Sequence, residues 1–137
     1  MKVIVDTNIV LDVLLARKPF AGPAAKVFGL VERSEIEAYL CATTMTTVDY
    51  LLGQSLPRAR ARDALHGLLS LFEIAPVNRP VIEEALKSRI TDFEDAVLEQ
   101  SGHLVEAEAI VSRDVKGFRH SSLTAFDPVE LLTHLQP

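Results

Sequence analysis

Hydrophobic and polar positions follow two rhythms along the chain. Short runs rich in β-branched and other apolar residues are typical of buried strands, and they predict strands at 1–5, 36–41, 72–75, 109–112 and 123–126. Apolar residues that recur every three or four positions predict helices at 8–16, 23–33, 43–52, 57–69, 81–89, 93–105 and 128–135. Two prolines and a glycine predict a loop over 17–23.

Strands that alternate with helices of this length indicate βαβ crossovers. Such crossovers produce a mostly parallel sheet with helices on both of its faces. We therefore expect a three-layer α/β/α fold. A chain of 137 residues has an ordinary size for one domain, so we expect a single domain over residues 1–137.

Charge and hydropathy narrow the classes of function. The net charge of −5 argues against a protein that coats duplex DNA regardless of sequence, because phosphate neutralisation dominates that kind of binding. It does not exclude an enzyme that meets phosphate through metal ions. No stretch approaches the roughly 20 apolar residues of a membrane helix, and the first residues do not resemble a secretion signal. We therefore expect a cytoplasmic protein without a membrane segment.

Four aspartates have the placement of a shared site. Asp6 directly follows the first predicted strand, and Asp114 follows the fourth. The carboxyl ends of parallel strands border the crevice in which ligands bind. Asp92 and Asp95 are three residues apart at the start of a predicted helix, so they share one face. Carboxylates that meet in a crevice repel one another unless a hard divalent cation is present, which predicts a Mg²⁺ or Mn²⁺ site and nuclease chemistry.

Each acid also has a plainer interpretation. Asp6 is a favoured N-cap for the helix that follows it. Thr91 and Glu94 have the spacing of a capping box, in which the two helix aspartates are only favourable first-turn charges. Asp114 is a residue type that suits a turn. A shared site explains better why all these acids gather at the same edge of the sheet.

Three segments make the interpretation more specific. They are 5–12 (VDTNIVLD), 92–96 (DFEDA) and 110–118 (IVSRDVKGF). In this order and spacing the sequence resembles the PIN-domain ribonucleases, in particular the VapC-like toxins of bacterial type II toxin–antitoxin pairs, over nearly its whole length. The resemblance implies a PIN-like fold and a catalytic centre of Asp6, Asp95 and Asp114. It also implies dependence on Mg²⁺ or Mn²⁺, an RNA substrate and a cognate antitoxin partner.

One position departs from the family pattern. Many relatives carry a glutamate on the third helix, three residues after a threonine, and that position is Thr47 here. Asp49 lies two residues further on, which rotates a helical side chain by roughly 200°, so it should point away from wherever Thr47 points. Asp92 is the better candidate for the missing charge because it shares a face with Asp95. Thr47 itself is kept as a candidate substrate contact.

Other polar residues are candidates for RNA contacts. Thr7 and Asn8 begin the first helix, where hydroxyl and amide groups suit a phosphate or a metal-bound water. Arg113, Lys116 and the basic pair 119–120 lie around the last of the four aspartates, and their charges suit an RNA backbone. A solvated loop is the alternative interpretation of this basic cluster.

Two other classes of function fit parts of the pattern. Receiver-type phosphoacceptors and haloacid-dehalogenase-like phosphatases also place an aspartate at the end of a first strand, but the latter need a second aspartate where this chain has Asn8. A PIN-like domain that has lost catalysis and only binds a protein or RNA is favoured by Thr47 and opposed by the retained aspartates. The sequence is also compatible with a homodimer.

Overall fold

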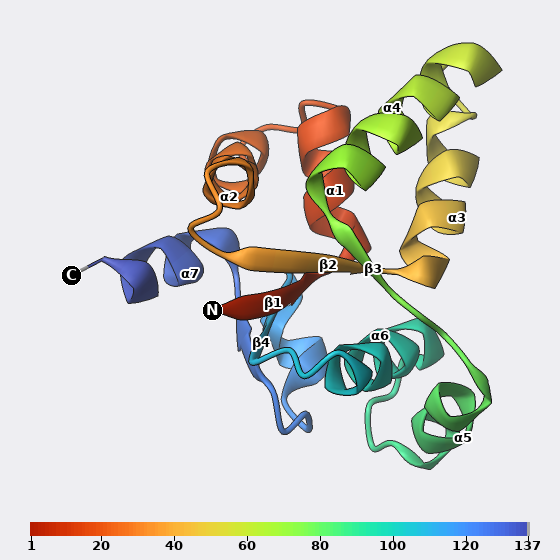
Figure 1. Cartoon of the computed structure of the whole chain (residues 1–137), viewed down its shortest axis with the longest axis vertical. Helices are drawn as coiled ribbons and strands as arrows, with labels where there is room; N and C mark the ends of the chain where they lie inside the picture. Colours follow the sequence, from red (N-terminus) through yellow and green to blue (C-terminus); the bar gives the residue numbers. More distant parts are fainter. Residues whose placement is uncertain (137) are drawn as a thin grey trace.

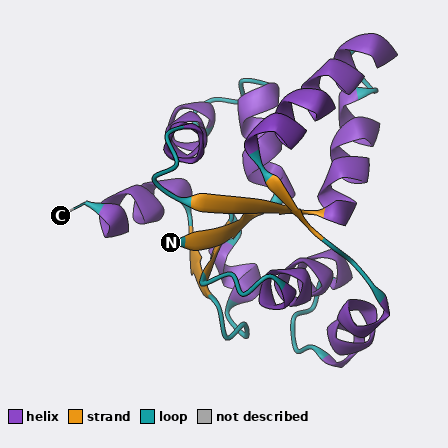
Figure 2. Cartoon of the chain, in the orientation of Figure 1, coloured by secondary structure: helices purple, strands orange, loops and turns teal. Residues whose placement is uncertain are grey.

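The computed structural model describes residues 1–136, which form a three-layer α/β/α fold around a five-stranded sheet (Figures 1 and 2). Neighbouring strands pair parallel throughout, in the order β3-β2-β1-β4-β5. The strands are β1 (Lys2–Val5), β2 (Glu37–Cys41), β3 (Glu73–Ala75), β4 (Ala109–Val111) and β5 (Thr124–Phe126). The predicted fold class is confirmed.

Helices cover both faces of the sheet. On one face lie α1 (Thr7–Leu14), α2 (Ala21–Glu32), α3 (Ala42–Leu52), α4 (Arg58–Leu71) and α7 (Pro128–Leu135). On the other lie α5 (Arg79–Lys87), α6 (Phe93–Leu104) and the short 3₁₀ helix η1 (Val115–Phe118). Within residues 1–136, every helix is too short or too polar to span a membrane.

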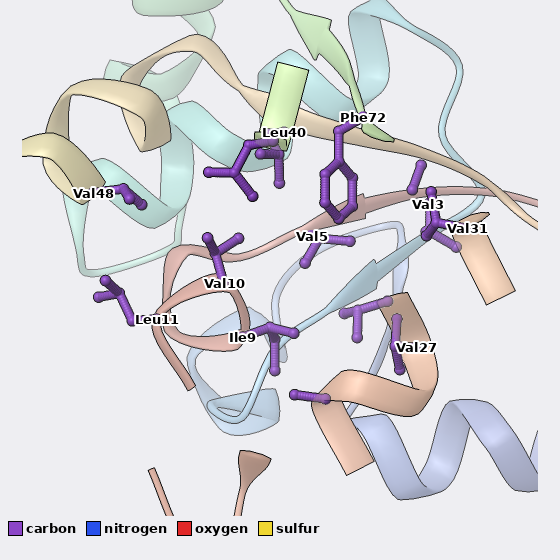
Figure 3. Packing of buried hydrophobic residues seen from close by; sticks show 14 of the residues in the cluster. Val3, Val5, Ile9, Val10, Leu11, Val27, Val31, Leu40, Val48 and Phe72 are labelled. Carbon is purple, nitrogen blue, oxygen red and sulfur yellow. The ribbon is translucent and has the colours of Figure 1, made fainter. Parts of the chain in front are cut away.

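The alternation of side chains along the strands divides the interior into two apolar clusters. Val3 and Val5 of β1 point to the face covered by α1, where they pack with Ile9 (Figure 3). Ile4 between them and Ile110 of β4 point to the opposite face and pack with residues of α6. All five side chains are fully buried. The central strand is therefore apolar on both faces, as the unbroken hydrophobic run at the start of the sequence predicts.

The first strand lies at the centre of the sheet, at the point where the addition of strands changes from one side to the other. From β1 the chain adds β2 and β3 on one side, and it later adds β4 and β5 on the other. Ligands bind beyond the carboxyl ends of the strands at such a switch point. One further hydrogen bond joins β1 and β4 directly after β1 ends: the N–H of Asp6 donates to the carbonyl of Val111 over 2.9 Å.

Two local predictions are wrong. α2 begins at Ala21 and not at Pro23, because a proline in the first helical turn lacks only an N–H that has no partner there. The strand predicted over 109–112 ends one residue earlier, and the turn that was the alternative interpretation of Asp114 takes the form of the helix η1. β4 ends at Val111, so Asp114 stands three residues beyond the strand, at the start of that helix.

Candidate active site

Asp6 is held at the end of β1 by donors from two segments. Its backbone is extended and it is the N-cap of α1, so the capping interpretation is correct as far as it goes. One carboxylate oxygen accepts from the N–H of Thr7 at 2.7 Å, and the other accepts from the hydroxyl of Ser112 at 2.7 Å. The residue is 8% exposed. A single orientation of this carboxylate is therefore fixed at the switch point.

Ser112 connects the two strand ends, and it was not among the predicted site residues. Its buried hydroxyl donates to Asp6 and accepts from the backbone N–H of Asp114 at 3.0 Å. The side-chain amide of Asn8 lies 3.3 Å from the same hydroxyl, and its carbonyl oxygen accepts from the N–H of Arg113 at 3.2 Å. A polar residue at the end of the apolar run 109–112 was the only signal for it in the sequence.

The start of α6 supplies three more acids. Asp92 is the N-cap of this helix, and its side chain accepts from the N–H of Asp95 at 3.0 Å. The capping box predicted from Thr91 and Glu94 is wrong by one residue, because Asp92 takes the capping position. Glu94 is therefore free of any capping role.

Asp114 is fixed by the helix that it begins. Its side chain accepts from the N–H of Gly117 at 3.1 Å. A Cβ at position 117 would lie 2.5 Å from a carboxylate oxygen of Asp114, which is closer than such atoms approach. The lack of a side chain at position 117 therefore leaves space for the carboxylate of Asp114.

These segments enclose an acidic hollow of about 340 Å³ beyond the carboxyl ends of β1 and β4. Its acids are Asp6, Asp92, Glu94, Asp95 and Asp114. Thr7, Asn8 and Arg113, which the sequence suggested as RNA contacts, also line it, together with Arg17, which the sequence did not indicate. A second hollow of about 350 Å³ shares three of the aspartates and adds the predicted basic pair 119–120. Lys116 lines neither of them.

Position 47 lies outside both hollows. The hydroxyl of Thr7 meets that of Thr44 on α3 at 3.0 Å, and Thr44 is buried, so it is Thr44 that contacts the site from this helix. Thr47 is about one turn further along α3. Asp49 pairs with Arg62 of α4 at 3.2 Å and likewise does not line either hollow.

Crowding of the acids changes their protonation. The pKa of Asp95 is raised to about 7 by partial burial and by the nearby charges of Asp6, Asp92, Asp114 and Glu94. Burial also raises the pKa of Asp6, against the opposing effect of its hydrogen bonds, and the charges of Asp114 and Asp92 add to the rise. Burial, Asp6 and Asp92 raise the pKa of Glu94. The acids of the hollow therefore concentrate negative charge on one side of it.

The oxygen atoms of this hollow are of the kind that bind a metal ion, but their spacing does not suit direct coordination. Carboxylate oxygens are the ligands that Mg²⁺ and Mn²⁺ prefer, and mutual repulsion of the acids is what a cation relieves. Among residues 1–136, however, no group of three or more His, Cys, Asp or Glu side chains is close enough to hold an ion directly. Mg²⁺ commonly keeps several waters, so acids spaced around a hollow suit a hydrated ion.

The sequence profile of the PIN domain matches residues 2–116. The chain belongs to the PIN-domain family. This confirms the predicted family, and the receiver and dehalogenase interpretations lose their support. No curated protein matches the sequence of this PIN domain.

Solved structures with the same fold include chains of toxin–antitoxin complexes. One is from VapBC2 of Rickettsia felis bound to a promoter DNA fragment, with 15% identity, a TM-score of 0.73, and coverage of 93% of this chain and 98% of that one. Another is from a toxin–antitoxin complex of Klebsiella pneumoniae, with 20% identity, a TM-score of 0.71, and coverage of 92% and 97%. A third is from FitAB bound to an IR36 DNA fragment, with 17% identity, a TM-score of 0.74, and coverage of 92% and 94%. At these identities the likeness shows the fold of this PIN domain.

Proposed function

We propose that this PIN domain is a metal-dependent ribonuclease that hydrolyses RNA phosphodiester bonds in the acidic hollow. One observation carries the proposal. Five carboxylates from three segments line a single hollow at the switch point of the sheet, and partial burial together with the neighbouring acids raises the pKa of Asp95 to about 7. Negative charge crowded in this way is costly unless a cation offsets it, which is why such clusters mark functional sites.

A hydrated Mg²⁺ or Mn²⁺ would be held by Asp6, Asp95 and Asp114, with Asp92 beside them. When bound, such an ion supplies an activated water and neutralises charge on a phosphodiester under attack. The chain itself orients the acids, because Ser112 fixes Asp6 over 2.7 Å. The remaining substrate contacts that we propose are Thr7 and Asn8 at the start of α1, and Arg113 at the rim.

Glu94 is the second candidate for the carboxylate that Thr47 does not provide. It lines the acidic hollow, and both Asp6 and Asp92 contribute to the rise in its pKa. The sequence favoured Asp92 for this role, and both acids line the hollow. Cleavage by Glu94→Gln and Asp92→Asn, each compared with Asp49→Asn, separates the two assignments. The acid whose loss reduces the rate more supplies the missing charge.

The ribonuclease proposal is tested by incubating total RNA with the protein and Mn²⁺, with and without a chelator. We expect cleavage that the chelator abolishes and that Asp6→Asn removes. Asp49→Asn is the matched control, because it neutralises an acid outside both hollows. RNA that binds but is never cut would instead identify a PIN domain that has lost catalysis.

We further propose that this ribonuclease is the toxin of a toxin–antitoxin pair. The support is the family and the fold shared with a chain of a toxin–antitoxin complex and with chains of VapBC2 and FitAB. An antitoxin segment carrying arginine suits the acidic hollow, because a guanidinium pairs with two carboxylate oxygens at once. Wild type, Asp6→Asn and Asp49→Asn are expressed separately in a bacterial host. Growth should stop with wild type and Asp49→Asn only; equal growth of all three with soluble protein excludes the toxin role.

A further inference from the structure

Asp12 is a second buried carboxylate close to the active site, and two arginines neutralise it. It lies on α1 with 0% exposure. The Nε of Arg113 donates to one of its oxygens at 2.7 Å, and the other oxygen accepts from the Nε of Arg17 at 2.9 Å and from Nη2 of Arg113 at 3.2 Å. Both carboxylate oxygens are therefore used, and the three groups together carry one net positive charge.

Both arginines also line the acidic hollow. The Nη2 of Arg17 donates to the backbone carbonyl of Asn8. Among residues 1–136, the Nη1 groups of Arg17 and Arg113 have no hydrogen-bond partner. The acidic hollow thus has one anionic wall and one cationic wall. A cationic wall fixed by a buried carboxylate is preorganised to accept a phosphate oxygen.

A third hollow begins on the other side of Arg113. It has a volume of about 380 Å³, in the range of small-molecule sites, and Arg113 is the residue it shares with the acidic hollow. The guanidinium carbon of Arg113 lies 3.9 Å from the centre of the Phe20 ring. The other residues lining it are Pro19, Pro23, Asp127, Pro128 and Val129.

The lining of this third hollow has the chemistry of a base-binding site. Its walls are an aromatic ring, three prolines and the half-exposed Val129, which offer apolar faces for stacking. Asp127 adds a carboxylate that accepts hydrogen bonds, and within residues 1–136 one of its oxygens is used, by the N–H of Glu130 at 2.8 Å. An apolar slot beside a fixed guanidinium suits a nucleobase attached to a phosphate.

We propose that Arg17, Arg113 and the third hollow form a nucleotide subsite for the RNA strand. The phosphate of the nucleotide next to the cleaved bond binds the two arginines, and its base enters the hollow over Phe20. Asp12 is a positioning residue that fixes both guanidinium groups. The proposal rests on the proposed function for its choice of RNA, but binding to this subsite needs neither metal nor bond cleavage.

The test is a titration of ¹⁵N-labelled protein with nucleoside 5′-monophosphates in the presence of a chelator. The backbone amide signals of Phe20, Arg113 and Val129 should shift together. Ribose 5-phosphate carries the same phosphate without a base, and it should bind about tenfold more weakly or worse, the loss expected for one stacked base. Equal affinities for the two ligands, or shifts confined to the basic pair 119–120, would overturn the proposal.

Two tryptophan variants provide a matched comparison. Val129→Trp fills the third hollow from a side chain that is 57% exposed, whereas Leu86→Trp alters a 70% exposed side chain on α5, away from it. Val129→Trp should weaken nucleotide binding about tenfold and leave ribose 5-phosphate binding unchanged. Leu86→Trp should change neither. Equal behaviour of the two variants contradicts the subsite.

Arg17→Gln tests the phosphate half. It should weaken nucleotides and ribose 5-phosphate by the same factor, since it removes a contact that both ligands share. If the protein binds nucleotides in this pattern but never cuts RNA, the subsite proposal stands and the ribonuclease proposal is wrong. If Val129→Trp and Leu86→Trp cut RNA with equal efficiency and the protein binds no mononucleotide, the ribonuclease proposal stands and the subsite proposal is wrong.

Discussion

Two buried aspartates six residues apart have opposite environments. Asp12 is fully buried, and its charge is balanced by Arg17 and Arg113 within 3.2 Å. Asp6 is nearly as buried, yet its hydrogen-bond donors are a hydroxyl, a side-chain amide and a backbone N–H, and its charged neighbours in the hollow include other acids. The protein itself supplies the positive charge that balances Asp12. The groups that donate to Asp6 are uncharged.

From this difference we predict that Asp12 serves the fold and that Asp6 serves the proposed chemistry. A buried carboxylate without its cation is strongly destabilising, so removal of either partner of a completed pair is costly. A carboxylate that the fold already leaves unbalanced costs little to neutralise. We therefore expect stability to depend on the Asp12 pairs and metal binding to depend on the acids of the hollow.

The largest expected effect is the loss of Asp12. Asp12→Asn leaves two guanidinium groups facing a neutral amide, and we expect unfolding free energy to fall by about 3 kcal/mol. Asp6→Asn should cost about 1 kcal/mol or less, the value of a weakened hydrogen bond. Urea denaturation in the presence of a chelator measures both. Comparable losses for the two variants would show that the acidic cluster is as much a part of the stable fold as the arginine pair.

The next effect is stabilisation by divalent ions. At a hundredfold excess over its dissociation constant, an ion that binds only the folded state adds about 2.7 kcal/mol. Mg²⁺ or Mn²⁺ should therefore raise the melting temperature of wild type and of Asp49→Asn, and should do much less for Asp6→Asn. An unchanged melting temperature in wild type counts against any metal at this site.

The pH dependence of stability tests the crowding of the acids. Asp95 has a pKa of about 7 in the folded protein against 3.8 for the free side chain. Between about pH 4 and pH 7 the folded state therefore binds a proton that the unfolded state has lost, and metal-free stability falls as pH rises through this window. For a half-exposed carboxyl we expect a loss on the order of 1 kcal/mol.

Asp95→Asn should flatten this slope and stabilise the metal-free protein at pH 8. The comparison is urea denaturation at pH 5 and pH 8 in a chelator, with Asp49→Asn as the control that keeps the wild-type slope. A slope that survives in Asp95→Asn unchanged would assign the pH dependence to other groups.

The smallest effect on stability is expected from Gly117→Ala. The added methyl group displaces the carboxylate of Asp114, which then no longer caps η1, at a cost of about 1 kcal/mol. The same change should reduce stabilisation by Mn²⁺, because Asp114 leaves its place in the hollow. Gly22→Ala is the control, since a Cβ there has nothing within 4 Å. An undiminished response to Mn²⁺ in Gly117→Ala removes Asp114 from the proposed metal centre.

Local sequence patterns predicted the helices and strands, and they predicted that four of the acids lie close together. The apolar run before Asp6 and the strand signal before Asp114 sufficed, because the ends of parallel strands share an edge. Glu94 was misassigned through a single residue of register. With Asp92 as N-cap, Glu94 moves from the third helical position to the second, where no capping bond engages it.

Contacts between distant segments were beyond the sequence. Ser112 meets Asp6 across 106 positions, and Arg113 meets Asp12 across 101. Spacing reveals which residues share one helix face or one strand face, but not which side chains of separate elements meet. For the same reason Arg17 was counted as part of a loop, although it lines the acidic hollow.

The central position of β1 also makes the placement of Asp6 a long-range property of the fold. The N–H of Asp6 donates to the carbonyl of Val111, and its carboxylate accepts from Ser112, 106 positions away. Both bonds require β4 to lie beside β1. Local unfolding that separates β4 from β1 would therefore release the Asp6 carboxylate from Ser112, even if β1 and α1 stayed folded.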